Sequence, residues 1–206
     1  MIDYSQQLEQ DVILKYFEIN KGTTLLDIGA NDGETFSNSR ALILKGWGGV
    51  LVEPDVVPLN NLTKLYEFDS SIQIINCAID NFNGKIDMHC SGHHISEKDN
   101  GLLSTIYEKE KERWTKETFT KRVVDVIDFK TLLKKTKLKK IDFISIDAEG
   151  SDWNILQQID LKALGCQMVC VEYNNIDEIK NKAYNYMQNF GMKLFTMNGC
   201  NIIMGI

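Results

Sequence analysis

The sequence is poor in the residues and segments that mark several classes of protein. Only 2 of its 206 residues are proline and 25% are charged, which excludes disorder or low complexity as its main state. No apolar run approaches the roughly 18 to 20 residues that a membrane-spanning helix needs. The N-terminal segment is amphipathic and partly acidic, unlike a secretory signal. We therefore expect a cytosolic, cytoplasmic protein without a membrane span.

Cysteine pairs and excess positive charge are also missing. The five cysteines are odd in number, scattered and without a CxxC pair, so neither a disulfide framework nor a four-thiolate zinc site is expected, and most should be buried thiols. Lys and Arg number 23 against 29 Asp and Glu, a net charge of −6, which disfavours nucleic acid as a partner. The lysine-rich run at 134–140 is interpreted as the exposed end of a helix and the loop after it.

What is present is a regular alternation of strand-like and helix-like segments. The 43% of hydrophobic residues suffices for one sizeable core, and we predict a single domain over residues 1–206. The alternation predicts a mostly parallel sheet with helices on both faces. The expected strands are Thr23–Ile28, Gly49–Glu53, Ile72–Cys77, Ile141–Ile146 and Met168–Tyr173, and the expected crossover helices are Ser39–Lys45, Val57–Phe68, Asp152–Ile159 and Ile176–Asn189.

Two regions depart from this rhythm. Met192–Met197 and Cys200–Gly205 are strand-like and separated only by Asn198-Gly199, too short for a parallel crossover, so they predict an antiparallel hairpin that reverses the last strand. Residues 80–125 are interpreted as an insertion near the open edge of the sheet. Within it, Asn83-Gly84 predicts a tight turn of a β-hairpin between Ala78 and His89.

The segment LLDIGANDGETF places Gly29 and Gly33 between a buried strand and an expected helix, where the backbone can turn sharply beside a ligand. Glu53 ends the next strand, where a carboxylate can accept hydrogen bonds from ribose hydroxyls. The spacing is not the G-x-G-x-x-G of a pyrophosphate loop. Asp27 and Asp32 add negative charge, which repels phosphate but suits the ammonium and sulfonium of S-adenosylmethionine. These residues predict that cofactor.

IDFISIDAEG at 141–150 and DIGANDGETF at 27–36 resemble segments of the FkbM-type family of S-adenosylmethionine-dependent methyltransferases, which have the class I methyltransferase fold. The resemblance extends to other short segments and to the final hairpin. It implies an α/β, Rossmann-like fold with a mostly parallel seven-stranded sheet, an antiparallel last strand and the inserted β-hairpin region. It also implies a cofactor loop of Gly29, Asn31 and Gly33, ribose binding by Glu53, an adenine pocket lined by Ala78, and Asp147 at the methionine end.

The family resemblance further implies an O-methyltransferase that acts on the hydroxyl of a sugar or another small molecule. Two machineries for activating that hydroxyl stay open. The first is a histidine base, His93 or His94, with Asp147 and Glu149 near the reacting centre. The second is a divalent cation, Mg²⁺, Mn²⁺ or Ca²⁺, bound by Asp147 with Glu172 or Asn174; a third carboxylate is missing from that set. Asp152 is interpreted as a favourable charge in the first turn of a helix.

Other functions compete with this one. An RNA or protein methyltransferase has the same fold, and a non-catalytic adenosyl-binding module has the same cofactor loop. A nicotinamide oxidoreductase is opposed by the absent third glycine and by the terminal hairpin. Trp114 is interpreted either as a platform for a sugar ring or, more simply, as an anchor for the insertion. The acceptor, the general base and the oligomeric state are left open by the sequence.

Overall fold

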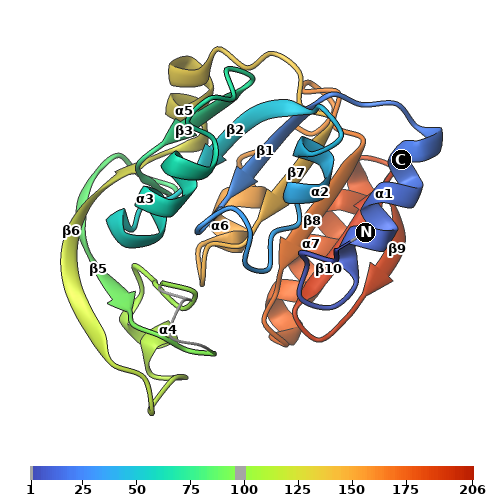
Figure 1. Ribbon diagram of the computed structural model, residues 1–206. Helices are drawn as coiled ribbons and strands as arrows, with labels where there is room; N and C mark the ends of the chain where they lie inside the picture. Colours follow the sequence, from blue (N-terminus) through green and yellow to red (C-terminus); the bar gives the residue numbers. More distant parts are fainter. Residues whose placement is uncertain (1, 96–100) are drawn as a thin grey trace.

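A computed structural model of the protein describes residues 2–95 and 101–206. Its centre is a seven-stranded sheet with the strand order β3-β2-β1-β7-β8-β10-β9 (Figure 1). The neighbours from β3 to β8 are all parallel, whereas β10 runs antiparallel to both β8 and β9. The expected fold class, with its reversed last strand, is confirmed. The strands of this sheet are β1 (Thr24–Ile28), β2 (Gly48–Val52), β3 (Ile72–Ile75), β7 (Phe143–Ile146), β8 (Met168–Glu172), β9 (Lys193–Met197) and β10 (Asn201–Gly205).

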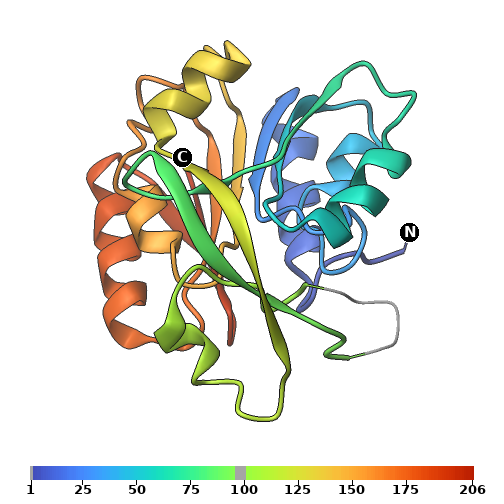
Figure 2. The same ribbon diagram turned by 90° about the vertical axis from the view of Figure 1, so that its left-hand side faces the viewer.

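Helices cover both faces of this sheet because alternate strand residues point to opposite sides. Leu25 of β1 packs into the apolar cluster that includes Ile13 and Leu62, and the next residue, Leu26, packs into the cluster that includes Leu132 and Met187. Figure 2 shows the two helical layers on either side of the sheet. The first layer consists of α1 (Glu9–Ile19), α2 (Arg40–Ile43) and α3 (Val56–Leu65), and the second of α5 (Phe129–Thr136), α6 (Asp152–Leu156) and α7 (Asp177–Asn189).

The end of the lysine-rich helix and the state of the cysteines agree with the sequence predictions. Helix α5 begins at the cap Asp128, whose carboxylate accepts the N–H of Thr131, and its last turn carries Lys134 and Lys135, as the lysine run predicted. All five cysteines are free thiols, and every one except Cys200 is buried. Over residues 2–95 and 101–206, no helix combines the length and the apolar character needed to cross a bilayer.

The insertion forms a second sheet. The prediction of a β-hairpin that turns at Asn83-Gly84 was wrong. Its strands have the order β4-β6-β5, so the segments on either side of Asn83-Gly84 do not pair with each other. Strand β6 lies between them, because its Val126 is opposite both Ala78 on one side and Gly84 on the other. Asn83 bonds instead to Asp128, at the end of β6. The elements of this region are β4 (Ala78–Ile79), β5 (Gly84–Ser91), α4 (Glu108–Lys111) and β6 (Phe119–Ile127).

The long β5–β6 ribbon determines where the insertion lies. It is antiparallel along its whole length, from Gly84 opposite Val126 to Ser91 opposite Phe119. In Figure 1 the ribbon lies on the β3 side of the large sheet and curves beneath the carboxyl ends of the parallel strands, where α4 is also found. The insertion therefore borders the edge of the sheet at which α/β proteins bind ligands.

Candidate active site at the carboxyl edge of the sheet

One cavity lies along the carboxyl edge of the large sheet and is closed on its other side by the insertion. Most of the residues predicted from the sequence line it. They are Asp27, Gly29, Asn31, Glu53 and Ala78 from the predicted cofactor site, Asp147, Glu149 and His94 from the predicted reacting centre, and Glu172 and Asn174 from the predicted metal set. Gly33 and His93 are not among the lining residues, and His93 is exposed.

Gly29 follows β1 directly and lies against the backbone of Asp147, which follows β7. Its φ of +86° is in the left-handed region, and a Cβ at this position would lie 1.6 Å from the carbonyl oxygen of Asp147. Asp147 in turn donates its N–H to the carbonyl of Ile28. A side chain at residue 29 would push these two strand ends apart. The glycine therefore keeps Asp147 beside the loop that is predicted to hold the cofactor.

The second glycine of the predicted cofactor loop, Gly33, lies against a helix. Gly33 packs against α3, since an added Cβ would meet Leu62 at 2.7 Å and Tyr66 at 3.1 Å. The helix expected at Ser39–Lys45 is present as α2, which begins at Arg40. The side chain of Asp32 accepts the backbone N–H groups of Glu34 and Thr35 and so stabilises the turn before α2. Asp32 is not among the residues that line the cavity.

Glu53 is buried at the end of β2 and is held by backbone donors. One carboxylate oxygen accepts the N–H of Asn31 at 2.9 Å and the other accepts the N–H of Asp55 at 2.7 Å. Burial raises the pKa of Glu53 to about 8, although these two N–H groups favour the charged form. Each oxygen keeps a further lone pair, so the carboxylate can still accept from two vicinal hydroxyls. This geometry fits a ribose.

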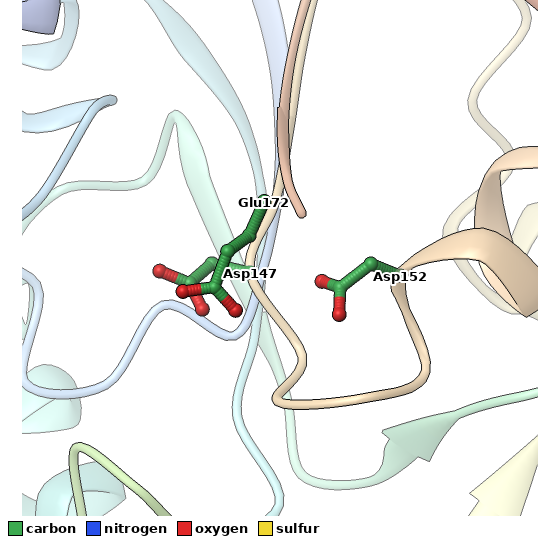
Figure 3. A group of neighbouring side chains, drawn as sticks. All are labelled: Asp147, Asp152 and Glu172. Atoms are coloured by element: carbon green, nitrogen blue, oxygen red, sulfur yellow. The ribbon is translucent and has the colours of Figure 1, made fainter. Parts of the chain in front are cut away.

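Three acids at the predicted reacting centre, Asp147, Asp152 and Glu172, form a cluster in which Asp147 is partly exposed and the other two are buried (Figure 3). Oxygens of Asp147, Asp152 and Glu172 all lie within 4.8 Å of one another. Burial, and next the charge of Asp152, raise the pKa of Asp147 to about 7. Burial and the charge of Asp147 likewise raise the pKa values of Glu149 and Glu172 well above the ordinary range. Ionising these groups in the ligand-free site is costly, so a positively charged ligand would be strongly favoured there.

Asp152 is the carboxylate that the sequence interpretation missed. It lies in the first turn of α6, as expected, but it is buried and its two oxygens accept the N–H groups of Ala148 and Gly150 at 2.8 and 3.0 Å. These bonds fix the turn in which Glu149 has a φ of +43°. Asp152 thus brings a third carboxylate near the predicted metal set. The only sequence signal was its spacing of five residues after Asp147.

The side chain of Asn174 faces the acids with its N–H groups. Its Nδ2 donates to Glu172 Oε2 at 2.6 Å and to Glu149 Oε2 at 3.4 Å. The backbone carbonyl of Asn174 accepts from Arg113, whose guanidinium also pairs with Glu110. As a metal ligand, Asn174 would have to turn its amide oxygen inward. In the structure it is instead a hydrogen-bond donor to the two glutamates.

The two histidines predicted as bases have different environments. His94 lines the cavity, its Nδ1 lies 3.0 Å from Glu117 Oε1, and its ring is 5.1 Å from that of Trp114. Trp114 also lines the cavity, and its buried indole N–H has no hydrogen-bond partner within residues 2–95 and 101–206. Of the two, only His94 is brought to the cavity.

A buried polar network, also missed from the sequence, fixes the insertion to the main sheet. Asp80 accepts hydrogen bonds from the hydroxyls of Tyr107 and Ser151, both at 2.7 Å, and from Asn154 Nδ2 at 3.2 Å. Burial, and next the bond to Asp80, raise the pKa of Tyr107 to about 12, so the phenol stays a donor. The network holds the segment around Tyr107 against α6, at the rim of the cavity.

The fold is Rossmann-like, the architecture of the class I methyltransferases, and its site contains the residues predicted to hold S-adenosylmethionine. A family model described as "Methyltransferase FkbM domain" matches residues 27–194, which is most of the chain. The protein therefore belongs to the FkbM methyltransferase family and is an S-adenosylmethionine-dependent methyltransferase. A search of curated proteins finds no significant match.

Solved structures with this fold are distant in sequence. Precorrin-6y C5,15-methyltransferase from Geobacter metallireducens GS-15 is 11% identical, with a TM-score of 0.52 over 96% of this chain and 86% of that one. The N-terminal domain of human METTL16 in complex with SAH is 12% identical, with a TM-score of 0.50 over 99% of this chain and 71% of that one. At such identities the likeness is one of fold, and the acceptor has to be inferred from the site.

Proposed function

We propose that the protein transfers a methyl group from S-adenosylmethionine to a hydroxyl, most simply that of a sugar. The observation that carries the proposal is the buried carboxylate of Glu53, whose oxygens keep lone pairs for a ribose in a cavity that continues to Asp147. The bound cofactor supplies an electrophilic methyl group on a sulfonium. Negative charge at Asp27 and Asp147 favours that cation over a phosphate.

The chain's own residues would act mainly by positioning. Gly29 allows the loop to approach the end of β7, Glu53 fixes the ribose, and the insertion closes the cavity over both reactants. Holding the acceptor oxygen in line with the bond that breaks is worth roughly 7 to 11 kcal/mol in well-oriented reactions. A base then needs only to accept the hydroxyl proton, which is a smaller contribution of about 10² to 10⁴ in rate.

Three residues are proposed as that base. Asp147 and Glu149 line the cavity with pKa values raised by burial, so their charged forms would accept a proton readily. His94, paired with Glu117, is the third. His93 is exposed, and as a base it would have to move into the cavity. The divalent-cation alternative uses Asp147, Glu172 and Asn174 and requires Asn174 to give up its bonds to the glutamates.

The test is incubation with methyl-labelled S-adenosylmethionine and a panel of glycan fragments, read by mass spectrometry. Transfer of one methyl group to a sugar oxygen is the expected result. Asp147→Asn and His94→Ala should each lower turnover at least tenfold, and the exposed His93→Ala serves as the matched control. Activity unaffected by EDTA would remove the cation machinery. Cofactor binding without turnover on any acceptor would favour a non-catalytic adenosyl-binding module.

An RNA acceptor is the competing proposal of the same fold. It would require salt-sensitive binding of a polyanion by a chain with a net charge of −6 and a cavity rich in carboxylates. Titration with single-stranded RNA at low and high salt distinguishes the two. We expect no binding of RNA in the micromolar range.

A further inference from the structure

The acceptor end of the cavity can be located from the strand order, given the proposed function. The order β2-β1-β7-β8-β10 places Asp147 two strands from Glu53, with Glu172 and Asn201 on the next two strands. At about 4.8 Å a strand, Asp147 lies roughly 10 Å from Glu53 along the sheet edge, and Asn201 roughly 19 Å. Only a few covalent bonds separate the ribose hydroxyls from the sulfur. The methionine end of the cofactor is predicted to lie at Asp147, so we assign Glu172 and Asn201, one and two strands further along, to the acceptor.

Asn201 presents an unused hydrogen-bond acceptor at that end. The residue is 3% exposed and lines the cavity, and its Oδ1 has no hydrogen-bond partner among the residues that the structure describes. Its Nδ2 donates to Glu9 Oε1 at 2.9 Å. Rotating the amide would bring its oxygen against the Glu9 carboxylate, so the observed orientation is fixed. Asn201 is also opposite Glu172 in the antiparallel register, which puts the two side chains on one face about 5 Å apart.

Carboxyl groups are concentrated at the strand ends beside Asn201. The carboxylates of Asp147, Glu149 and Glu172 line the same part of the cavity. Arg113 makes its bonds to Glu110 and to the Asn174 carbonyl, and the Asn174 amide donates to Glu149 and Glu172. Beside Glu172 and Asn201 the wall thus carries several carboxyl oxygens. A buried acceptor without a partner costs about 1 to 3 kcal/mol, so a ligand rich in donors is favoured.

A protonated amine meets this requirement better than either alternative. A neutral hydroxyl brings one donor together with lone pairs of its own, whereas an ammonium brings three donors, no acceptor and one positive charge. A divalent cation bound by the three acids that lie closest together, Asp147, Asp152 and Glu172, would need Asp152 as a ligand. That residue does not line the cavity, and its two oxygens already accept the N–H groups of Ala148 and Gly150.

We infer that the acceptor carries a protonated primary amine, bound by Glu172 and Asn201, next to the group that is methylated. Within the proposed function, this makes the substrate class an amino sugar or a related amino alcohol. The matched probes are glucosamine, N-acetylglucosamine and glucose, together with the galactosamine and mannosamine sets. Their dissociation constants are measured by calorimetry on the protein saturated with S-adenosylhomocysteine, and methyl transfer is followed in parallel.

The free amine should bind at least tenfold more tightly than the acetylated and hydroxyl partners in at least one set. Asn201→Leu and Glu172→Gln should each abolish that preference while S-adenosylhomocysteine binding stays within twofold. Asn198→Ala is the matched control. Asn198 also donates to Glu9, at 2.6 Å, but does not line the cavity, so its loss should lower stability and leave the preference intact.

Two results would overturn this inference without contradicting the methyltransferase function. The first is equal affinity for amine and hydroxyl sugars in every set. The second is tight binding of Mn²⁺ or Mg²⁺ that depends on Asn201 and is not displaced by any amine. Failure to bind S-adenosylhomocysteine at all would instead overturn the proposed function. Transfer of the methyl group to the amine nitrogen would support the cationic acceptor and refute O-methylation.

Discussion

Replacing Gly29 by alanine tests whether the close approach of Gly29 to the backbone of Asp147 holds Asp147 in position. Gly29 and Gly46 have nearly the same left-handed backbone, with φ of +86° and +89°. A Cβ at Gly46 meets nothing within 4 Å, whereas at Gly29 it would lie 1.6 Å from the carbonyl oxygen of Asp147. Both alanine variants lose about 1 to 2 kcal/mol to the left-handed conformation. Only Gly29→Ala must also separate two paired strand ends.

Gly46→Ala should therefore lower the melting temperature by about 2 to 8 °C, at roughly 2 to 4 °C per kcal/mol for a chain of this size. Gly29→Ala should lose about 4 kcal/mol or more in urea unfolding and should no longer bind S-adenosylhomocysteine measurably, since relieving the clash displaces backbone. Circular dichroism at 10 °C checks that the variant is folded when binding is measured. If the free energies of unfolding of the two variants differ by less than 1 kcal/mol, the close approach of Gly29 to Asp147 does not constrain the site, and Gly29 does not position Asp147.

Three further predictions follow from the charges and hydrogen bonds. Because burial and Asp152 hold the pKa of Asp147 near 7, its carboxylate becomes charged between pH 6 and 8. Over that range the affinity for S-adenosylmethionine, relative to that for S-adenosylhomocysteine, whose sulfur is uncharged, should rise about fivefold to tenfold. In Asp147→Asn, competition binding should show a ratio that does not change with pH. Asp142 is buried, but the ammonium of Lys140 and several N–H donors outweigh burial and lower the pKa of Asp142. The charged Asp142 therefore stabilises the fold above about pH 4, and this stabilisation is lost as the pH falls through the lowered pKa. Asp142→Asn should cost about 2 kcal/mol in urea unfolding at pH 7, and a deficit that persists undiminished at pH 3 would contradict this. Tyr107→Phe removes the hydroxyl bonded to Asp80 and should cost about 1 to 2 kcal/mol, with unchanged stability as the opposing result.

Much of the fold was predictable because buried parallel strands are short apolar runs that end in polar residues. TTLLDI and IDFISI each contain one strand of the large sheet, and the two-residue connection at Asn198-Gly199 permits only an antiparallel pair. The glycine loop and Glu53 were predictable for a similar reason, since both lie directly after such strands. Predictions failed where a local pattern had two structural solutions. Asn83-Gly84 is a good hairpin turn, yet the strands beside it both pair with β6.

The sequence by itself determined the order of strands and helices, the reversed final strand and the residues that follow each parallel strand, since these depend on neighbours along the chain. The tertiary structure alone decided which strands lie side by side. Strand β10 is inserted between β8 and β9, which sets Asn201 beside Glu172, and the turn before α6 brings Asp152 back toward Asp147. Such pairings depend on packing between segments far apart in sequence, and no local pattern encodes them.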